Sequence, residues 1–348
     1  MEQMNDNEFD DFPPIVPIAE LWDNLPELAP PLIDGVLRQG HKMLIAGPSK
    51  AGKSYALIEL CCAIAEGKKW LGFPCAQGRV LYVNLELDRA SCLHRFRDIY
   101  EALGWQPRCI GNIDIWNLRG NAMPLNELAP KIIQRARGKG YIAISIDPIY
   151  KVLTGNENNN SDMSKFVSHF DHIASELNTA LIYCHHHSKG DQSWKRPIDR
   201  NSGAGVFGRD PDAILDVIEL ELPPERRIYD ISAWRITGIL REFLPFPPVD
   251  VWFNYPIHVV EHFDSKEIIA PHHELPSWKR AMNGRDTKEE KLRKRQHRLE
   301  AAYDICSTHG SVTISSMSDY LDVSTQTVRN LVDQHPNFIR EKGIIFRK

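Results

Sequence analysis

The segment at positions 47–54, "GPSKAGKS", carries the most specific chemistry in the sequence. It fits the pattern G-x-x-x-x-G-K-[ST] and lies between "KMLIA", which predicts a strand, and residues 54–66, which predict a helix. Backbone N–H groups of such a loop turn inward around phosphate oxygens, and the N-terminus of the next helix favours an anion. The predicted phosphate loop comprises Gly47, Pro48, Ser49, Lys50, Ala51, Gly52, Lys53 and Ser54.

Two side chains of this loop and one distant carboxylate predict a nucleotide and a metal ion. We expect Lys53 to reach the β- and γ-phosphates of ATP and the Ser54 hydroxyl to coordinate Mg²⁺. Asp147 ends the apolar strand "YIAISID", and an acid at the end of a buried strand is typical of the residue that holds the magnesium water shell. The sequence therefore predicts ATP and Mg²⁺ as ligands.

The run "CHHHSKG" places three histidines at the end of another apolar strand. Three adjacent imidazoles suggest a zinc site. On a strand, however, His185 and His187 share one face and His186 points to the other, so the three cannot converge on one ion. No Cys/His set at ligand spacing supplies a fourth ligand, so the pattern disfavours zinc.

The elements that position these residues alternate between strand and helix. Apolar strands are separated by predicted helices at 54–66, 89–104, 125–138 and 161–178. Such apolar strands are buried on both faces in a mostly parallel sheet flanked by helices, so we predict an α/β core. The later strands, "AILDVIELEL", "RIYDISAWRI" and "VDVWFNY", follow one another closely, which indicates antiparallel edge strands.

Composition and charge divide the chain of 348 residues into a core and smaller parts. We predict an acidic, Pro-rich tail at 1–30, an ATPase domain at 31–262, a linker at 263–290 and a small domain at 291–348. Residues 279–348 contain fourteen Lys/Arg against nine Asp/Glu, on a chain of net charge −4. No signal peptide or membrane span is apparent, and the seven cysteines lack a C-x-x-C pair, so we expect a cytoplasmic protein.

The ordered motifs of the core resemble those of the RepA-type hexameric ATPases of the RecA/DnaB-like P-loop superfamily. The resemblance covers about residues 33–260 and lies in "GPSKAGKS", "VLYVNLELD", "SIDPIYKV", "CHHHSKG", "GAGVFGRDPDAIL" and "LREFLPFPPV". It implies a RecA-like core that assembles into a homo-oligomeric ring hexamer. It further implies that Glu86 is the catalytic base and that His186, with His185 beside it, senses the γ-phosphate.

The same resemblance implies that a cation from a neighbouring subunit completes the site. Arg209 and Arg241 are the candidates, with Arg235 behind them. An arginine in this role stabilises the charge that spreads over the phosphoryl group in the transition state.

The loop at 188–203, "SKGDQSWKRPIDRNSG", is a candidate surface for single-stranded DNA. Cations bind phosphates and an aromatic ring stacks on bases. The candidates in and beside the loop are Lys189, Trp194, Lys195, Arg196 and Arg200.

The C-terminal segment resembles a winged helix-turn-helix domain, from about Leu299 to Lys348. In that family the second helix, here 325–334, enters the major groove of duplex DNA. We expect Thr325, Gln326 and Arg329 to contact DNA. Because winged helices also dock proteins, that alternative stays open. The basic run "RDTKEEKLRKRQHR" predicts either a non-specific grip on DNA or a solvated helix face.

Together these features predict an ATP-dependent DNA helicase or translocase of RepA type that acts in replication of a plasmid or mobile element. An ATP-switched DNA-binding regulator or loader without unwinding activity is the alternative. A small-molecule P-loop kinase is disfavoured because the sequence has a helix-turn-helix pattern and no Arg-rich lid.

Overall fold

The structure is a computed structural model, and it describes residues 14–153, 155, 157, 159–187, 197–200, 205–220, 231–261, 299–300, 302–304, 306–307, 311–321, 323–333 and 335–348. The chain divides into two compact units, Met1–Ala270 and Pro271–Lys348, which are described separately.

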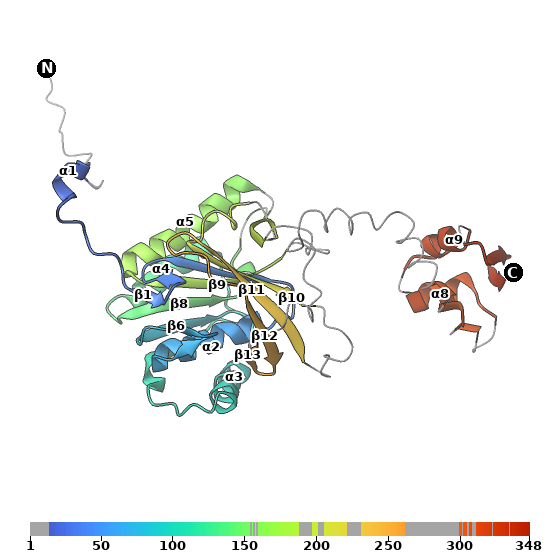
Figure 1. The fold of residues 1–348 in the computed structure, drawn as a ribbon, viewed down its shortest axis with the longest axis horizontal. Helices are drawn as coiled ribbons and strands as arrows, with labels where there is room; N and C mark the ends of the chain where they lie inside the picture. Colours follow the sequence, from blue (N-terminus) through green and yellow to red (C-terminus); the bar gives the residue numbers. More distant parts are fainter. Residues whose placement is uncertain are drawn as a thin grey trace, which may run out of the picture. The chain divides into compact units, whose positions relative to one another are not determined.

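The first unit is built on one large mixed sheet (Figure 1). Among the described residues it has nine strands in the order β13-β12-β11-β10-β3-β9-β8-β6-β7. The six strands from β10 to β7 are parallel: β3 (Lys42–Gly47), β6 (Arg79–Asn84), β7 (Ile113–Asn117), β8 (Tyr141–Asp147), β9 (Ala180–His186) and β10 (Ala213–Glu219). Three antiparallel strands extend the sheet beyond β10: β11 (Ser232–Leu240), β12 (Val249–Asn254) and β13 (Ile257–Val260).

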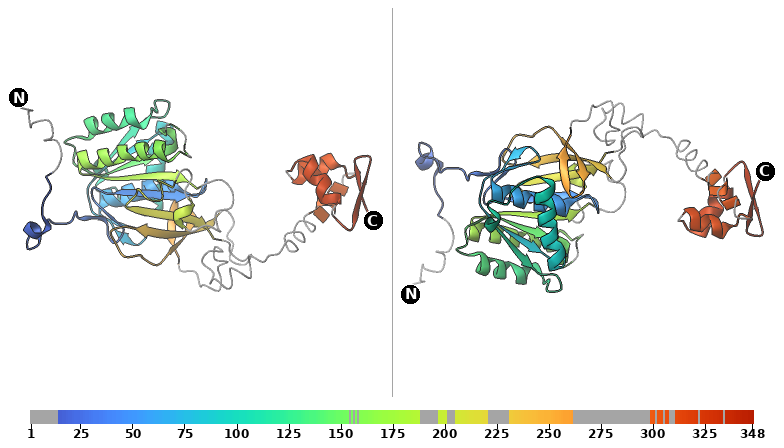
Figure 2. Two further views of the ribbon diagram at one scale, coloured as in Figure 1. Left: turned by 90° about the horizontal axis from the view of Figure 1, so that it is seen from above. Right: turned by 90° about the horizontal axis from the view of Figure 1, so that it is seen from below.

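Helices cover both faces of this sheet (Figure 2). One face packs against α2 (Lys53–Glu66) and α3 (Arg89–Ala102), and the other against α4 (Leu125–Ala136) and α5 (Asn160–Leu177). The sequence of α4 explains its packing on the sheet, because apolar residues recur at helical spacing and form one buried face. These residues are Leu125, Leu128, Ile132 and Ala136. The α/β core is therefore confirmed, as are β11 and β12 as antiparallel strands near the sheet edge. The same expectation is wrong for β10, which lies inside the sheet and pairs parallel with β3.

Short elements complete the first unit. They are α1 (Ile18–Leu21), β1 (Pro31–Ile33), β2 (Leu37–Arg38), β4 (Lys69–Trp70), β5 (Phe73–Pro74) and the 3₁₀ turns Ile110–Asn112, Ile149–Lys151 and Pro197–Asp199. None of the helices in the described part of the chain combines the length and apolar character that a membrane span requires. Cys61 and Cys62 are buried free thiols on α2.

The described part of the second unit begins with helical residues at 299–300, 302–304 and 306–307, which are followed by two further helices and a hairpin. The elements are α8 (Ile314–Leu321), α9 (Thr325–Asp333), β14 (Phe338–Glu341) and β15 (Ile344–Arg347). Met317, Val328, Phe338 and Ile345 form part of its small apolar core. The order helix, helix, hairpin agrees with the sequence pattern. The assignment of this unit to the winged-helix family stays a prediction.

Candidate nucleotide site

The loop 47–52 joins β3 to α2 and has a backbone that few residues can adopt. Lys50 and Gly52 both have positive φ, 67° and 73°. At position 52 only glycine fits, because a Cβ atom there would lie 2.8 Å from Nε2 of His258. The loop is thus shaped both by its own conformation and by β13, which packs against it.

Lys53, the first residue of α2, is the buried cation of this site. Its side chain is 7% exposed, and its Nζ donates to the backbone oxygens of Gly47 (2.8 Å) and Pro48 (2.6 Å). Burial lowers its pKa to about 8. No carboxylate forms an ion pair with Nζ among the described residues. An anion such as a phosphate would supply the charge that Lys53 lacks.

His186, the last residue of β9, lies against Lys53. The distance from Lys53 Nζ to His186 Nδ1 is 3.3 Å. Burial, and secondarily the charge of Lys53, lowers the pKa of His186 to about 4, so the imidazole is neutral at pH 7. Because the lysine ammonium can only donate, Nδ1 accepts and the ring proton is assigned to Nε2. Nε2 is therefore a donor suited to a phosphate oxygen.

Asp147 ends β8, the strand next to β9 in the sheet, and is 4% exposed. The Tyr82 hydroxyl donates to Asp147 Oδ2 at 2.7 Å, whereas Oδ1 is buried without a hydrogen-bond partner among the described residues. Burial raises the pKa of this carboxyl, and its contacts with the Tyr82 and Ser54 hydroxyls oppose that rise. A buried carboxyl group that contacts the Ser54 hydroxyl and keeps one oxygen without a hydrogen-bond partner among the described residues fits a Mg²⁺ site, since Mg²⁺ prefers oxygen ligands.

Glu86 follows β6 and is exposed in the same cleft. Its backbone N–H donates to Asn84 Oδ1 at 3.3 Å, and Asn84 is held in turn by Asn117 Oδ1 at 2.7 Å. An exposed carboxylate on a fixed turn can accept a proton from water.

The cleft has a volume of about 650 Å³ and an aromatic end that sequence reasoning missed. Tyr55 and Phe253 line it with ring centroids 5.5 Å apart, and the Arg95 guanidinium carbon lies 4.5 Å from the Tyr55 centroid. Phe253 comes from β12, and the adjoining β13 is fixed to α2 by a buried contact of 2.5 Å between His258 Nδ1 and Glu59 Oε1. No local signal links residues 55 and 253, because only the folded sheet brings them together.

The three histidines have separate partners. His185 lies on the α5 face with its ring 4.6 Å from that of Phe207, and its Nε2 is 3.2 Å from Glu157 Oε1. His187 Nε2 is 2.9 Å from Asp216 Oδ1. Among the described residues no group of His, Cys, Asp or Glu is arranged to hold a metal ion.

One predicted DNA contact is wrong. Arg200 is 0% exposed and forms a buried ion pair with Asp216, the carboxylate that also contacts His187. A buried and paired guanidinium cannot present its charge to a nucleic acid. The sequence shows the charge of Arg200 but not its partner on β10. The other candidates of this loop, Lys189, Trp194, Lys195 and Arg196, lie outside the described residues.

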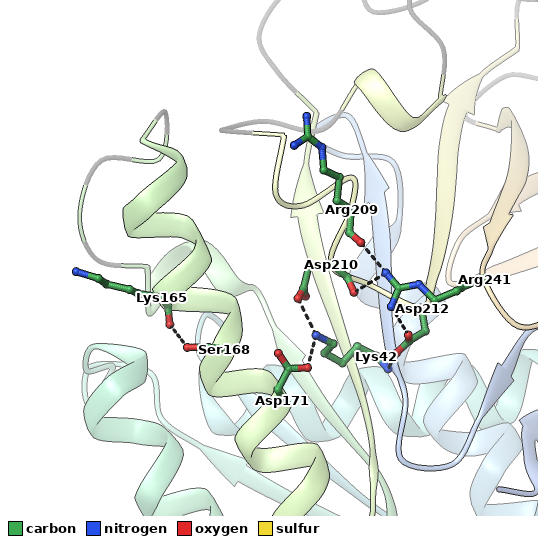
Figure 3. A network of polar contacts seen from close by, with 8 residues as sticks. All are labelled: Lys42, Lys165, Ser168, Asp171, Arg209, Asp210, Asp212 and Arg241. Carbon is green, nitrogen blue, oxygen red and sulfur yellow. Dashed lines mark hydrogen bonds and ion pairs between the residues drawn. The ribbon is translucent and has the colours of Figure 1, made fainter. Parts of the chain in front are cut away.

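The remaining candidates lie away from the cleft. Arg235 forms a bidentate ion pair with Asp250 at 2.7 and 2.9 Å. Arg241 donates to Asp212 Oδ1 at 2.8 Å and to the backbone oxygen of Arg209 at 2.7 Å (Figure 3). Neither arginine lines the cleft. In the second unit Thr325, Gln326 and Arg329 are exposed on α9, as DNA contact would require, and whether they bind DNA stays a prediction.

Comparison with known proteins identifies a family and solved structures of similar fold. Residues 11–192, slightly more than half of the chain, match a family described as "AAA domain". The matched range includes the phosphate loop, Glu86, Asp147 and His186. A solved structure titled "ATPase Domain of G40P" is similar over 65% of this chain and 86% of that one, with 15% identity and a TM-score of 0.48. No curated protein matches the chain.

Proposed function

The chain belongs to the AAA domain family, and from this premise we propose that it is an ATPase of RepA type that acts as a DNA helicase or translocase. The observation that carries the proposal is the contact between Lys53 and the neutral His186 in a cleft that Asp147 and Glu86 also line. Family membership accounts for nucleotide binding. The arrangement of these four side chains supports hydrolysis.

The triphosphate of ATP would bind at Lys53, and the base at the aromatic end of the cleft. A phosphate oxygen can replace the two backbone carbonyls that Lys53 now contacts and supply the missing negative charge. Tyr55, Phe253 and Arg95 offer ring faces and a planar cation for a purine. Ser54 and Asp147 would hold Mg²⁺, which neutralises phosphate charge when it is bound.

Hydrolysis would begin with a water molecule held by Glu86. The water oxygen bonds to the γ-phosphorus, one proton passes to the Glu86 carboxylate, and the bond to the β,γ-bridging oxygen breaks. The products are ADP and inorganic phosphate, and Glu86 returns its proton to solvent. His186 Nε2–H would donate to a γ-phosphate oxygen and lose that acceptor when phosphate leaves.

The residues after His186 support coupling between the γ-phosphate and the candidate DNA loop. His187 and Arg200 both contact Asp216, so positions 187 and 200, on either side of the candidate loop cations, are tied to β10. Asp216 pairs in register with Ala46, next to the phosphate loop. A shift of His186 on phosphate release would therefore act at the anchored end of the loop.

The test measures ATP hydrolysis with and without single-stranded DNA, together with the native mass. We expect stimulation by single-stranded DNA and the mass of a ring hexamer. Stimulation by duplex DNA alone would favour an ATP-switched regulator or loader. Transfer of phosphate to a small molecule would contradict both. His186→Ala should keep ATP binding and lose the DNA stimulation, whereas His94→Ala, an exposed histidine on α3, should keep both.

A further inference from the structure

A groove that differs from the nucleotide cleft lies between α3, the turn Ile110–Asn112 and β7. Its volume is about 810 Å³, larger than that of the cleft, and the two share no lining residue in the described part of the chain. A second hollow beside it is lined by some of the same residues of α3 and β7, so both belong to one continuous groove. Phe96, Tyr100 and Trp105 make the lining largely apolar and aromatic.

The groove opens at one edge of the large sheet. β7 is the last strand in the sheet order and pairs only with β6 among the described residues. Two apolar residues that line the groove, Leu93 and Ile110, are 47% and 48% exposed. An exposed apolar surface of this kind is typical of a site that another chain covers.

The segment 15–28, which precedes β1, has an apolar surface of matching character. Seven large apolar side chains in it are exposed, from 37% for Leu21 to 101% for Ile15. Only Ile18–Leu21 is helical, and none of these four residues is buried. Four apolar side chains nevertheless recur at the spacing i, i+3, i+4 and i+7, which is typical of a helix that lays one face in a groove. They are Ile18, Leu21, Trp22 and Leu25.

The charges of the segment and the groove are complementary. The segment has no lysine or arginine and contains three acids, which are Glu20, Asp23 and Glu27. Arg89 and Arg97 line the groove, are exposed and form no ion pair with any described residue. Of the two acids that line the groove, Asp114 is already paired with Arg79 at 2.7 Å, and Glu101 remains. The groove therefore offers two available cations to an acidic segment.

The segment does not enter the groove of its own chain. Arg38 Nη1 donates to the backbone oxygen of Ala29 at 2.8 Å, and the backbone N–H of Gln39 donates to that of Pro30 at 2.9 Å. These two hydrogen bonds fix the direction in which the segment leaves β1, and Figures 1 and 2 show α1 apart from α3. One copy thus has both an open groove and an uncovered segment, so a second copy can supply the occupant of each.

We propose that residues 15–28 of one copy dock in the groove between α3 and β7 of a second copy. The segment binds as a helix over 18–25, because Pro26 cannot continue a helix. Its apolar face packs on the aromatic lining, and its acids face Arg89 and Arg97. The inference concerns assembly and goes beyond the proposed function, since the docking requires no nucleotide. Because the two surfaces differ, each copy can give its segment to one neighbour and receive that of another.

A chemical cross-link in the full chain tests the docking. Cys109 is a free, partly exposed thiol next to Ile110 in the groove. In a Cys306→Ser background, Leu25→Cys should place a second thiol near Cys109 of another copy. A short bismaleimide should then give a product of at least twice the chain mass of 39.8 kDa on a denaturing gel. Cys109→Ser in the same chain should abolish that product.

The native mass of full-length variants measures the strength of the contact. Trp22→Glu alters the segment and Ile110→Glu alters the groove. Each should raise the concentration of half-assembly by about 30-fold or more, because a large anchor at the centre of an interface is lost. Leu244→Glu, at a leucine that is 89% exposed after β11, is the matched control and should leave the native mass unchanged.

An equal mixture of the two variants should partly restore assembly. The Trp22→Glu chain keeps an intact groove, and the Ile110→Glu chain keeps an intact segment. The mixture should therefore form pairs of chains at concentrations at which neither variant does so alone. Thermal melting of each variant checks that it folds.

Three results would overturn the inference. The first is a cross-link that joins Cys109 and position 25 within one chain, which would place the segment in its own groove. The second is a Trp22→Glu variant that assembles like the wild type. The third is a monomeric wild-type chain, which would leave the groove to a different protein. All these measurements are made without nucleotide, so a chain that assembles as expected and does not hydrolyse ATP would contradict the proposed function alone.

Discussion

Lys42 and Lys53 are both buried, but only Lys42 has carboxylate partners among the described residues. Lys42 is the first residue of β3, and Lys53 is the first residue of α2. The two residues are 6% and 7% exposed. Lys42 contacts two carboxylates, whereas Lys53 contacts two backbone carbonyls and an imidazole. A buried ammonium without an anion is costly, so Lys53 indicates a site that an anionic ligand completes.

The difference separates structural charges from functional ones across the molecule. Arg200, Arg235 and Arg241 each have a carboxylate partner and fix one part of the fold to another. Lys53 has none among the described residues, and it is the cation that we place on a nucleotide. Removing one of the three arginines should therefore affect stability, and removing Lys53 should affect activity.

The largest expected effect is at Lys53. Lys53→Ala should abolish ATP binding at micromolar concentrations and lower hydrolysis by about 10³-fold, because it removes the cation that binds the β- and γ-phosphates. Equilibrium binding of a fluorescent ATP analogue and a phosphate-release assay measure the two effects. Lys69→Ala, an exposed lysine on β4, should change neither. Tight ATP binding by Lys53→Ala would contradict the proposal that Lys53 binds the phosphates.

The buried Lys53, which has no carboxylate partner among the described residues, should make the free energy of unfolding depend on pH. The pKa of Lys53 is lowered from 10.5 to about 8 in the folded chain, so the unfolded chain binds more protons between these values. The free energy of unfolding should therefore rise with pH from 8 to 10.5, by about 3 kcal/mol from this group. Urea unfolding at several pH values measures this rise. Lys53→Met should lack it and Lys69→Met should keep it.

Lys42 should affect stability in the opposite way to Lys53. Lys42→Met leaves Asp210 partly buried without its cation and should lower the free energy of unfolding by about 1–3 kcal/mol. Lys53→Met removes a buried charge that has no anion and should leave stability equal or higher at pH 7. Urea unfolding of the two variants side by side compares them. If Lys53→Met lowered the free energy of unfolding more than Lys42→Met, the distinction between structural and functional cations would be wrong.

The smallest effect is expected in the second unit, where the same distinction applies. Arg340 forms a bidentate ion pair with Asp333. Among the described residues, the hydrogen bond of the Arg329 side chain on α9 is to the neutral Gln326, at 3.3 Å. Arg329→Ala should therefore weaken duplex DNA binding more than Arg340→Ala does. It should also reduce the slope of the logarithm of the binding constant against the logarithm of salt concentration by about one. Titrations at several salt concentrations measure this. Equal effects would favour a protein-docking role.

The residues at the ends of the central strands could be predicted because their signals are local. The phosphate loop, Glu86, Asp147 and His186 each follow an apolar run, and parallel strands bring such positions to one edge of a sheet. The structure places all four around one cleft. Their chemical roles remain proposals.

The partners of charged and aromatic residues could not be predicted. The cationic sequence neighbours of Arg200 predict a contact with DNA, but its partner Asp216 lies on a strand sixteen residues later. Arg209 and Arg241 looked equivalent until hydrogen bonds distinguished them. Phe253 and His258 reach the phosphate loop only because β12 and β13 continue the sheet around α2. These contacts join residues that are far apart in the sequence, so no local sequence pattern predicts them.

The packing of β13 on the phosphate loop has a consequence for the order of events during synthesis. The loop is translated early, but its shape depends on His258, which meets Glu59 at 2.5 Å and occupies the space beside Gly52. A nascent chain that ends before β12 has the whole phosphate-loop motif and lacks the wall against which the loop rests. We therefore expect the nucleotide site to reach its final shape only after about residue 260 has left the ribosome and β13 has joined the sheet.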